Sequence, residues 1–324
     1  MFKKKNKKAQ FAGFKWLLSI IIGAVILFLA LYFAGIITGT TGQQTAMTVS
    51  QQISVLLDPF SFSGISEAAS KEMKMPAITL MNFSCDSAND LIKLDVAVKK
   101  TAKGKATEVG KYSIYNKYIF SAAKIETKEF YVFAKPIDLP FHIANSVYII
   151  DKQYCFVSAP QEIKDEIDDL NITSIVFENS TYACDDNSVS VCFEKSGCDI
   201  SVYGQNSAPG FSESKYDFGY TTNNGARLEY ITKSLMYASI FSDSNIYKCN
   251  LQRLNKKITT LVAIYSSKAS SLSSRGCILG STVSELNNFK TNSDSMLNNQ
   301  PLAPLFISSK NLLAANSNVD CKIF

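Results

Sequence analysis

Histidine is almost absent from this sequence, because His142 is the only one among 324 residues. A single histidine leaves no second imidazole for a His-based zinc site and none in excess for a Ser/His/Asp triad. His142 lies in the apolar stretch of residues 139–143. We therefore expect it to pack or to cap an element rather than to act as a catalytic base.

The common catalytic motifs are missing as well. The sequence has no C-x-x-C pair, which disfavours a zinc ribbon and a thioredoxin-type site. The patterns G-x-x-x-x-G-K-[ST], G-x-G-x-x-G, H-E-x-x-H and G-x-S-x-G do not occur either, so the usual nucleotide-binding, zinc-protease and hydrolase motifs are absent. No EF-hand pattern surrounds the acidic residues Asp165, Glu166, Asp168 and Asp169, which we interpret as a solvated helix face, or the turn at residues 185–187. We predict a protein that is not an enzyme and uses no cofactor or metal.

No acidic residue precedes Asp58, and the start of the chain is first basic and then apolar. Residues 17–37 form a run of 21 residues without a charged side chain. At about 1.5 Å per residue, a helix of that length spans the roughly 30 Å core of a bilayer. Short Lys-rich flanks stay in the cytoplasm, so we predict a single-pass membrane protein with a cytoplasmic N-terminus and an extracellular C-terminal domain. The alternative is a cleaved signal peptide, whose apolar region is usually only about 7–15 residues long.

The part of the chain beyond this span has no net positive charge. The whole chain has 33 Lys and Arg against 28 Asp and Glu, but six of the lysines lie within the first sixteen residues. The remainder is close to neutral, whereas a nucleic-acid-binding domain needs a clustered basic face. We therefore predict the lipid bilayer, and no nucleic acid, as a partner.

Cysteine is confined to the part of the chain that follows the span, where all eight cysteines lie. An even number on the external side indicates disulfides. Cys192 and Cys198 flank a short turn between two predicted strands, so we favour a bridge between them. Eight cysteines allow on the order of a hundred pairings, which leaves the others open, although a bridge from Cys321 to Cys249 or Cys277 would hold the C-terminus. The further cysteines expected in disulfides are Cys85, Cys155, Cys184, Cys249, Cys277 and Cys321.

The pattern of residues predicts an α+β fold, with an antiparallel β-rich ectodomain followed by a C-terminal helical region. Runs of β-branched and aromatic residues begin near Pro76, and helical spacing takes over after Ile231. Apolar residues recur from Tyr247 to Tyr265 at coiled-coil spacing, but over too few heptads for a coiled coil. We expect this stripe to pack within the chain rather than between chains. The predicted divisions are a basic cytoplasmic tail (1–16), a transmembrane helix (17–37), a helical stalk and linker (38–75), a β-rich extracellular domain (76–231) and a helical region (232–324).

The expected elements within these divisions follow from local patterns. Strands are expected at residues 77–83, 91–99, 112–120, 129–133, 147–157, 172–177, 188–193, 198–203 and 227–231. We expect residues 188–193 and 198–203 to pair as a hairpin. Helices are expected at residues 161–170, 234–241, 247–265, 283–289 and 302–315.

The start of the chain, Lys7-Lys8-Ala9-Gln10-Phe11 followed by a long apolar run, resembles archaeal type IV pilin-like precursors with a class III signal peptide. This resemblance implies a leader cleavage between Ala9 and Gln10 and a filament or membrane helix over residues 11–57. Ala9 stands where that family usually has Gly, and Phe14 where it usually has Glu. Most of the remaining chain resembles uncharacterised archaeal membrane-anchored proteins from small-genome lineages, and this resemblance implies no activity. It is carried by residues 117–120, 130–136, 154–160 and 321–324.

These observations lead to a ranked set of hypotheses for the function. The first is a single-pass, membrane-anchored, non-catalytic extracellular protein, which is a pilin-like or accessory component of a cell-surface assembly with other envelope or pilin-like subunits as partners. The alternative is a membrane-tethered ligand-binding or adhesion module. An exported enzyme with unfamiliar carboxylates is the least favoured. The sequence permits N-glycosylation at the sequons of Asn82, Asn171 and Asn179 and leaves it open whether they are used.

Overall fold

The computed structural model describes residues 69–99, 104, 106, 110–205, 214–298 and 300–324. The predicted tail, the predicted span at 17–37, the leader site at Ala9 and Gln10 and the stalk up to residue 68 lie outside this set. Among the helices that the structure describes, none is both long and apolar enough to cross a membrane.

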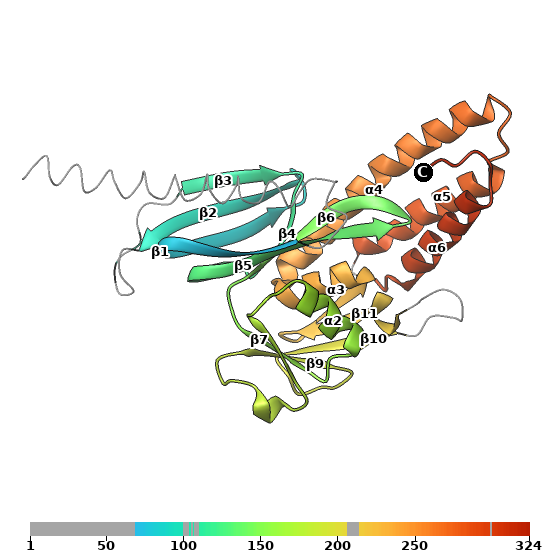
Figure 1. The fold of residues 1–324 in the computed structure, drawn as a ribbon. Helices are drawn as coiled ribbons and strands as arrows, with labels where there is room; N and C mark the ends of the chain where they lie inside the picture. Colours follow the sequence, from blue (N-terminus) through green and yellow to red (C-terminus); the bar gives the residue numbers. More distant parts are fainter. Residues whose placement is uncertain (1–68, 100–103, 105, 107–109, 206–213, 299) are drawn as a thin grey trace, which may run out of the picture.

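The first sheet is long and almost entirely antiparallel (Figure 1). Its described strands are β1 (Ala69–Asp86), β2 (Leu91–Lys99), β3 (Gly110–Tyr115), β4 (Tyr118–Phe120), β5 (Lys124–Leu139) and β6 (Phe141–Ile150). They lie in the order β3-β2-β1-β5-β6-β4, and every pair is antiparallel except β4 with β6. Leu94, Val96 and Val98 of β2 are buried, as the alternation of a strand predicts.

The second sheet has shorter strands and mixed directions. Its described strands are β7 (Tyr154–Val157), β8 (Ile175–Glu178), β9 (Val189–Phe193), β10 (Ile200–Gly204), β11 (Phe218–Asn223) and β12 (Ala226–Ile231). They lie in the order β12-β11-β10-β9-β7-β8. Helix α2 (Gln161–Asp169) connects the parallel strands β7 and β8, with Ile163 and Ile167 on its buried side. The described residues therefore form the predicted α+β fold, built on two sheets rather than one.

The prediction of antiparallel pairing is wrong for three of the five described pairings of the second sheet, and the predicted hairpin is wrong as well. β10 pairs with β9 in parallel, and β9 and β8 each pair with β7 in parallel. Residues 194–199 lead the chain from the end of β9 back along that strand, and β10 then begins with Ile200 opposite Val191. Both strands therefore run in the same direction. Glu194 and Gly197 have positive φ angles of 59° and 100° in this return. Parallel neighbours usually need about a dozen connecting residues, which is why the short connection indicated a hairpin.

Two predicted strands are each divided in the structure. Residues 112–120 are interrupted at Asn116, whose φ is 56°, and the two halves become β3 and β4 at opposite edges of the first sheet. Residues 147–157 are interrupted after Ile150, and the two halves become β6 of the first sheet and β7 of the second. In both runs the chain changes its neighbours at polar residues, Asn116-Lys117 in the first and residues 151–153 in the second.

A buried helix, α3 (Thr232–Phe241), lies between the two sheets and contacts β5 and β6 of the first and β11 and β12 of the second. Every residue from Ser234 to Phe241 is buried. A helix that is apolar all round is stable only where it is covered on all sides. Aromatic rings from both sheets surround it, and the ring centroids of Phe133 and Tyr237 are 6.4 Å apart. This helix makes the two sheets share one core.

Helix α4 (Ser244–Ser273) packs its first half on the first sheet and continues past it toward α5 (Gly280–Ser293) and α6 (Ala303–Ser317). The predicted apolar stripe of α4 packs within the chain, where Tyr247, Leu251, Leu254 and Ile258 are fully buried. Intermolecular coiling is not needed to cover these residues.

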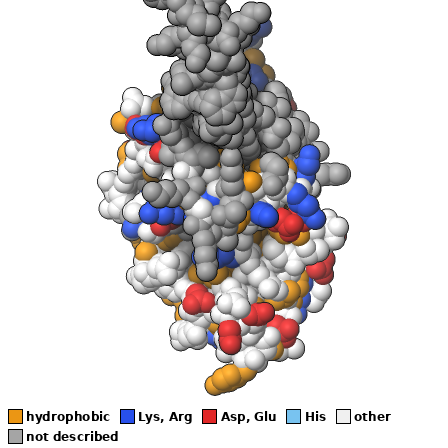
Figure 2. Space-filling view, turned by 90° about the vertical axis from the view of Figure 1, so that its left-hand side faces the viewer, with side chains coloured by type: hydrophobic (Ala, Val, Ile, Leu, Met, Phe, Trp, Pro, Cys, Tyr) orange, Lys and Arg blue, Asp and Glu red, His pale blue; other side chains and the backbone are white. Residues whose placement is uncertain are grey.

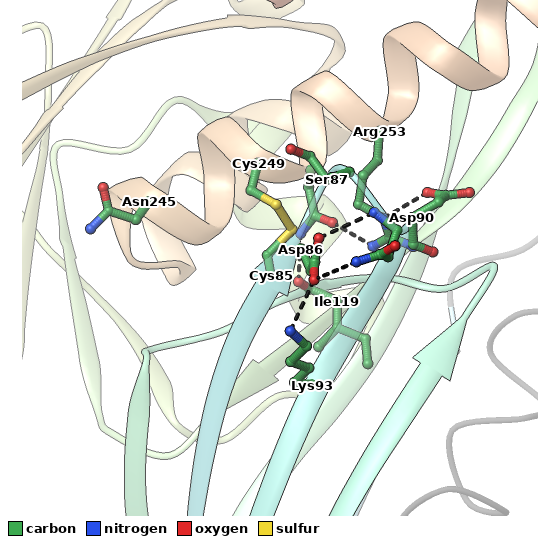
Figure 3. The surroundings of a disulfide bond; sticks show 12 residues. Cys85, Asp86, Ser87, Asp90, Lys93, Ile119, Asn245, Cys249 and Arg253 are labelled. Carbon is green, nitrogen blue, oxygen red and sulfur yellow. Dashed lines mark hydrogen bonds and ion pairs between the residues drawn. A yellow bond between two sulfur atoms is a disulfide. The ribbon is translucent and has the colours of Figure 1, made fainter.

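The contact between α4 and the first sheet contains a buried arginine beside a disulfide (Figure 3). Arg253 is completely buried. Its Nε donates to the Asp90 carboxylate at 2.9 Å, and its guanidinium also donates to the Lys117 carbonyl and to the Asn250 side chain. All donors of a buried guanidinium must find acceptors, so this site fixes the position of α4 on the sheet.

All eight cysteines are paired in the structure. Cys192 and Cys198, the pair favoured from the sequence, are joined, and Cys321 is joined to Cys277. The Cα–Cα distances of 5.7 to 6.0 Å are ordinary for disulfides. The four bonds are Cys85–Cys249, Cys155–Cys184, Cys192–Cys198 and Cys277–Cys321.

Candidate functional site: a charged cleft between α2, α3 and α6

A cleft of about 600 Å³ lies where α2, α3 and α6 meet the turn between β5 and β6. Its volume is in the range of small-molecule sites, which run from roughly 300 to 1,000 Å³. Leu139 and Pro140 of the turn form part of the apolar lining, and Phe306 and Leu313 of α6 form the rest. The other lining residues are polar or charged, so the cleft combines an apolar wall with groups that could orient a ligand.

Thr232, at the start of α3, lines the cleft in a strained conformation. Its φ is 67°, in the left-handed region that β-branched residues rarely adopt. Such a residue costs of order 1–3 kcal/mol, and strained residues are concentrated at binding and catalytic sites. The strain at Thr232 therefore marks this cleft, among the surfaces of the described residues, as the first candidate for function.

Two of the charged groups that line the cleft form an ion pair with each other. Lys233 of α3 forms an ion pair with Glu162 of α2, with 3.0 Å between Nζ and Oε2. The other carboxylate oxygen of Glu162 accepts a hydrogen bond from Ser214 at 2.6 Å. Asp217 closes a capping box with Ser214 at the 3₁₀ turn η3 (Lys215–Asp217). These contacts fix one wall of the cleft before any ligand enters.

Lys310 of α6 is different, because its ammonium group forms no ion pair with the residues that the structure describes. Its contact is with the ring of Phe306, whose centroid lies 5.3 Å from Nζ. Cation–π contacts of partly exposed lysines are worth only about 0.5–1 kcal/mol. The cleft therefore holds a half-buried cation beside an apolar wall, with its charge uncompensated.

A buried polar group lies behind the cleft and connects both sheets. Lys135 of β5 forms an ion pair with Glu166 of α2, and the Tyr237 hydroxyl of α3 donates to the same carboxylate at 2.9 Å. Burial, with a smaller contribution from Lys233, lowers the pKa of Lys135 to about 8. Burial also raises the pKa of Tyr237 well above its usual value. Lys135 thus remains a cation at neutral pH, held against Glu166.

His142 and Asp138 lie at the rim of the cleft, on the side of the turn between β5 and β6. The Nδ1 atom of His142 is 2.9 Å from the Asp138 carboxylate, and Asp138 lines the cleft. His142 is exposed rather than packed, because strand alternation turns it away from its buried neighbours Phe141 and Ile143. The expectation of a packing role is therefore wrong.

The acidic cluster of α2 is divided between solvent and core. Asp165, Asp168 and Asp169 are exposed, as predicted for a solvated face. Glu166 lies inward against Lys135, and Glu162 lines the cleft. The spacing of Glu162 and Glu166, four residues apart on the helix, was a visible signal for a shared inner face. Their lysine partners could not be found from the sequence, because they lie on other elements.

Among the described residues, no group of three or more His, Cys, Asp and Glu side chains could hold a metal ion. The predicted disulfide cysteines are all placed in covalent pairs, outside the lining of the cleft. Disulfides form and persist in oxidising compartments, so the fold and its covalent bonds define a disulfide-stabilised α+β domain of the extracellular type. No known protein family, curated protein or solved structure matches this chain.

Proposed function

We propose that the protein is a membrane-tethered extracellular module that binds a small ligand in the cleft between α2, α3 and α6 without converting it. The single observation that carries this proposal is the strained Thr232 in a preformed cleft of about 600 Å³. The four disulfides support a rigid extracellular scaffold around it. The apolar run at residues 17–37 supplies the tether in this proposal.

The charges in the cleft favour a particular kind of ligand. Glu162 is neutralised by Lys233, Asp138 lies against His142, and the Asp217 carboxylate accepts a hydrogen bond from the Ser214 backbone N–H. Lys310 is left as a cation beside Phe306, with Leu313 on the same helix. A small molecule with a carboxylate or phosphate group and an apolar body would satisfy both features, because a charge-assisted hydrogen bond to an ammonium group is among the stronger polar contacts.

A direct binding measurement tests this proposal. Phenylacetate and phenyl phosphate serve as anionic probes, and benzyl alcohol as the uncharged match, in titration calorimetry on the full chain in lipid nanodiscs. We expect both anions to bind more tightly than benzyl alcohol. Lys310→Met should weaken the anions about tenfold, while Lys268→Ala, at an exposed position of α4, should leave them unchanged. Equal binding of all three probes, or an equal loss in both variants, would contradict the assignment.

A second candidate is a pilin-like or accessory component of a surface assembly, and two side chains favour it. Tyr182 is 99% exposed and Ile278 is 90% exposed. Each lies within two residues of a disulfide cysteine, Cys184 and Cys277 respectively. Tyr182 belongs to the 3₁₀ turn η2 (Thr181–Ala183), and Ile278 belongs to the connection between α4 and α5. In Figure 1 the segment after β8 reaches the lower end of the ribbon, and the connection after α4 lies at the upper right. Apolar side chains that are held outward at two ends suit contacts between subunits.

The mature N-terminus tests this second candidate. If the chain is processed like a pilin precursor, mass spectrometry of the protein from its own membranes should find Gln10 as the first residue. An intact Met1 would contradict the hypothesis of a pilin-like component. Tyr182→Ser combined with Ile278→Ser should then leave ligand binding intact and reduce co-purification of other surface subunits.

A further inference from the structure

Among the strands that the structure describes, β8 forms one edge of the second sheet, because it pairs with β7 on one side and ends the strand order on the other. It consists of Ile175, Val176, Phe177 and Glu178, without a lysine or a proline. An exposed edge presents unpaired N–H and C=O groups, and proteins usually blunt such edges with charge, proline or a cover. Its length of four residues and the charge of Glu178 at its end are the protections that β8 has by itself.

Two N-glycosylation sequons flank this edge strand. Asn171 precedes β8 in the turn after α2, and Asn179 follows β8 directly. Both side chains are exposed, and neither side-chain amide forms a hydrogen bond with any residue that the structure describes. Asn171 has a φ of 50°, and Asn179 precedes the turn η2, so the chain bends at both sequons. Where the chain bends, the Asn side chain can approach the groups two residues further on.

The third sequon lies in a different setting. Asn82 is in the middle of β1, where it lies opposite Asp95 of β2 and Lys124 of β5. Hydrogen-bonded ladders on both sides keep this stretch extended. In an extended strand, residues two apart are separated by roughly 7 Å, so the chain at Asn82 is not bent toward the Ser84 hydroxyl.

We propose that Asn171 and Asn179 carry N-linked glycans, that Asn82 does not, and that the two glycans cover the edge of β8. The donor is an oligosaccharide carried on a lipid phosphate or pyrophosphate. The Asn Nδ2 atom forms a bond to the anomeric carbon, the bond from that carbon to the phosphate oxygen breaks, the lipid phosphate leaves, and the amide loses one proton. The inference rests on the extracellular placement proposed above.

Peptide mapping under non-reducing conditions tests this inference on the full chain from its own membranes. Trypsin cuts out residues 165–195, which contain both Asn171 and Asn179 and stay linked through Cys184 and Cys192 to residues 153–164 and 196–215. It also cuts out residues 75–93, which contain Asn82 and stay linked through Cys85 to residues 249–253. We expect a sugar mass at both asparagines of the first peptide and none at Asn82. Thr181→Ala should remove the sugar from Asn179 alone, while the matched variant Thr181→Ser, which keeps the sequon, should retain it.

The outcomes separate this inference from the proposed location. Unmodified Asn171 and Asn179 in a peptide whose cysteines are disulfide-bonded would overturn the glycans alone. Free thiols in the same peptide would overturn the extracellular placement itself. A sugar on Asn82 would overturn the selection by local structure. For the covering role, Asn171→Gln combined with Asn179→Gln should raise the self-associated fraction in sedimentation relative to Asn82→Gln, and equal fractions would refute it.

Discussion

The two sheets of this molecule are stabilised in different ways. The first is built from long strands, up to the 18 residues of β1, that pair almost entirely in the antiparallel direction. The second has no described strand longer than the six residues of β11 and β12 and contains three parallel pairings. Two of the four disulfides, Cys155–Cys184 and Cys192–Cys198, close loops of the second sheet. Short parallel strands gain little from their own ladders, so covalent closure stabilises what the strands alone do not.

The two sheets also differ in charge. Residues 69–150 contain twelve Lys and eight Asp and Glu, a net charge of +4, whereas residues 151–204 contain three Lys and eleven Asp and Glu, a net charge of −8. Figure 2 shows Asp and Glu side chains gathered in the lower part of one face, and most of the Lys and Arg side chains higher up. Opposite net charges favour the association of the two layers, and the ion pair of Lys135 with Glu166 lies at their contact.

The largest effect should come from the disulfide that ties the first sheet to α4. Cys85–Cys249 closes a loop of 164 residues and Cys192–Cys198 one of 6. Loop-closure entropy then assigns about 5 kcal/mol to the first and about 2 kcal/mol to the second. Denaturant unfolding of the paired Cys→Ser variants measures both. A larger loss of unfolding free energy on removing Cys192–Cys198 than on removing Cys85–Cys249 would contradict this prediction.

A substitution of the buried Arg253 is the second test of whether the two sheets differ in stability. Arg253→Met leaves Asp90 and the Lys117 carbonyl without their donor. Because the Asp90 side chain is 45% exposed, the loss should stay below the roughly 3–5 kcal/mol that breaking a fully buried pair costs. Hydrogen exchange should show the loss first in the first sheet and α4, with the second sheet still protected. The control is Arg275→Met, at an exposed position after α4. A uniform loss of protection over both sheets would mean that they unfold as one unit.

The contact between the sheets should depend on pH through Lys135. Burial lowers its pKa from the ordinary 10.5 to about 8, so between these pH values the unfolded chain binds more protons than the folded one. The unfolding free energy therefore rises with pH in this window, by about 2 kcal/mol between pH 8 and 10 relative to Lys135→Met. If the unfolding free energies of the unsubstituted protein and of Lys135→Met change with pH in the same way, the lowered pKa of Lys135 is contradicted.

The smallest effect concerns the return between β9 and β10. Gly197 has a φ of 100°, which costs a side-chain-bearing residue about 1–2 kcal/mol. Gly197→Ala should lower the unfolding free energy by that amount. Gly280→Ala serves as the match, because Gly280 is the first residue of α5 with open space around its Cβ position, and it should be neutral or slightly stabilising. Equal effects at both positions would show that the return is not strained.

Local patterns in the sequence predicted local structure well. Residues 91–99 were expected as a strand and form β2, and residues 227–231 were expected as a strand and form most of β12, which follows a turn where Asn224 and Gly225 both have positive φ. The C-terminal helices were also expected from their spacing. Each of these signals is contained within a few neighbouring residues.

Long-range pairing could not be predicted in the same way. The parallel order of β8, β7, β9 and β10 depends on where each strand is inserted in the sheet. The residues of a four-residue strand do not indicate which strands lie beside it. The cleft combines side chains from Asp138 to Leu313, and Lys135 and Glu166 meet from separate elements. The strain at Thr232 arises from the packing of α3 directly after β12, which no residue pattern announces.

The central claim is that four specific disulfides hold an extracellular α+β domain together, and a non-reducing peptide map of the full chain from its own membranes tests it most directly. The account predicts no free thiols and four disulfide links, which join Cys85 to Cys249, Cys155 to Cys184, Cys192 to Cys198 and Cys277 to Cys321. Eight thiols that react with a labelling reagent in the unreduced protein, or a different set of pairs, would contradict it.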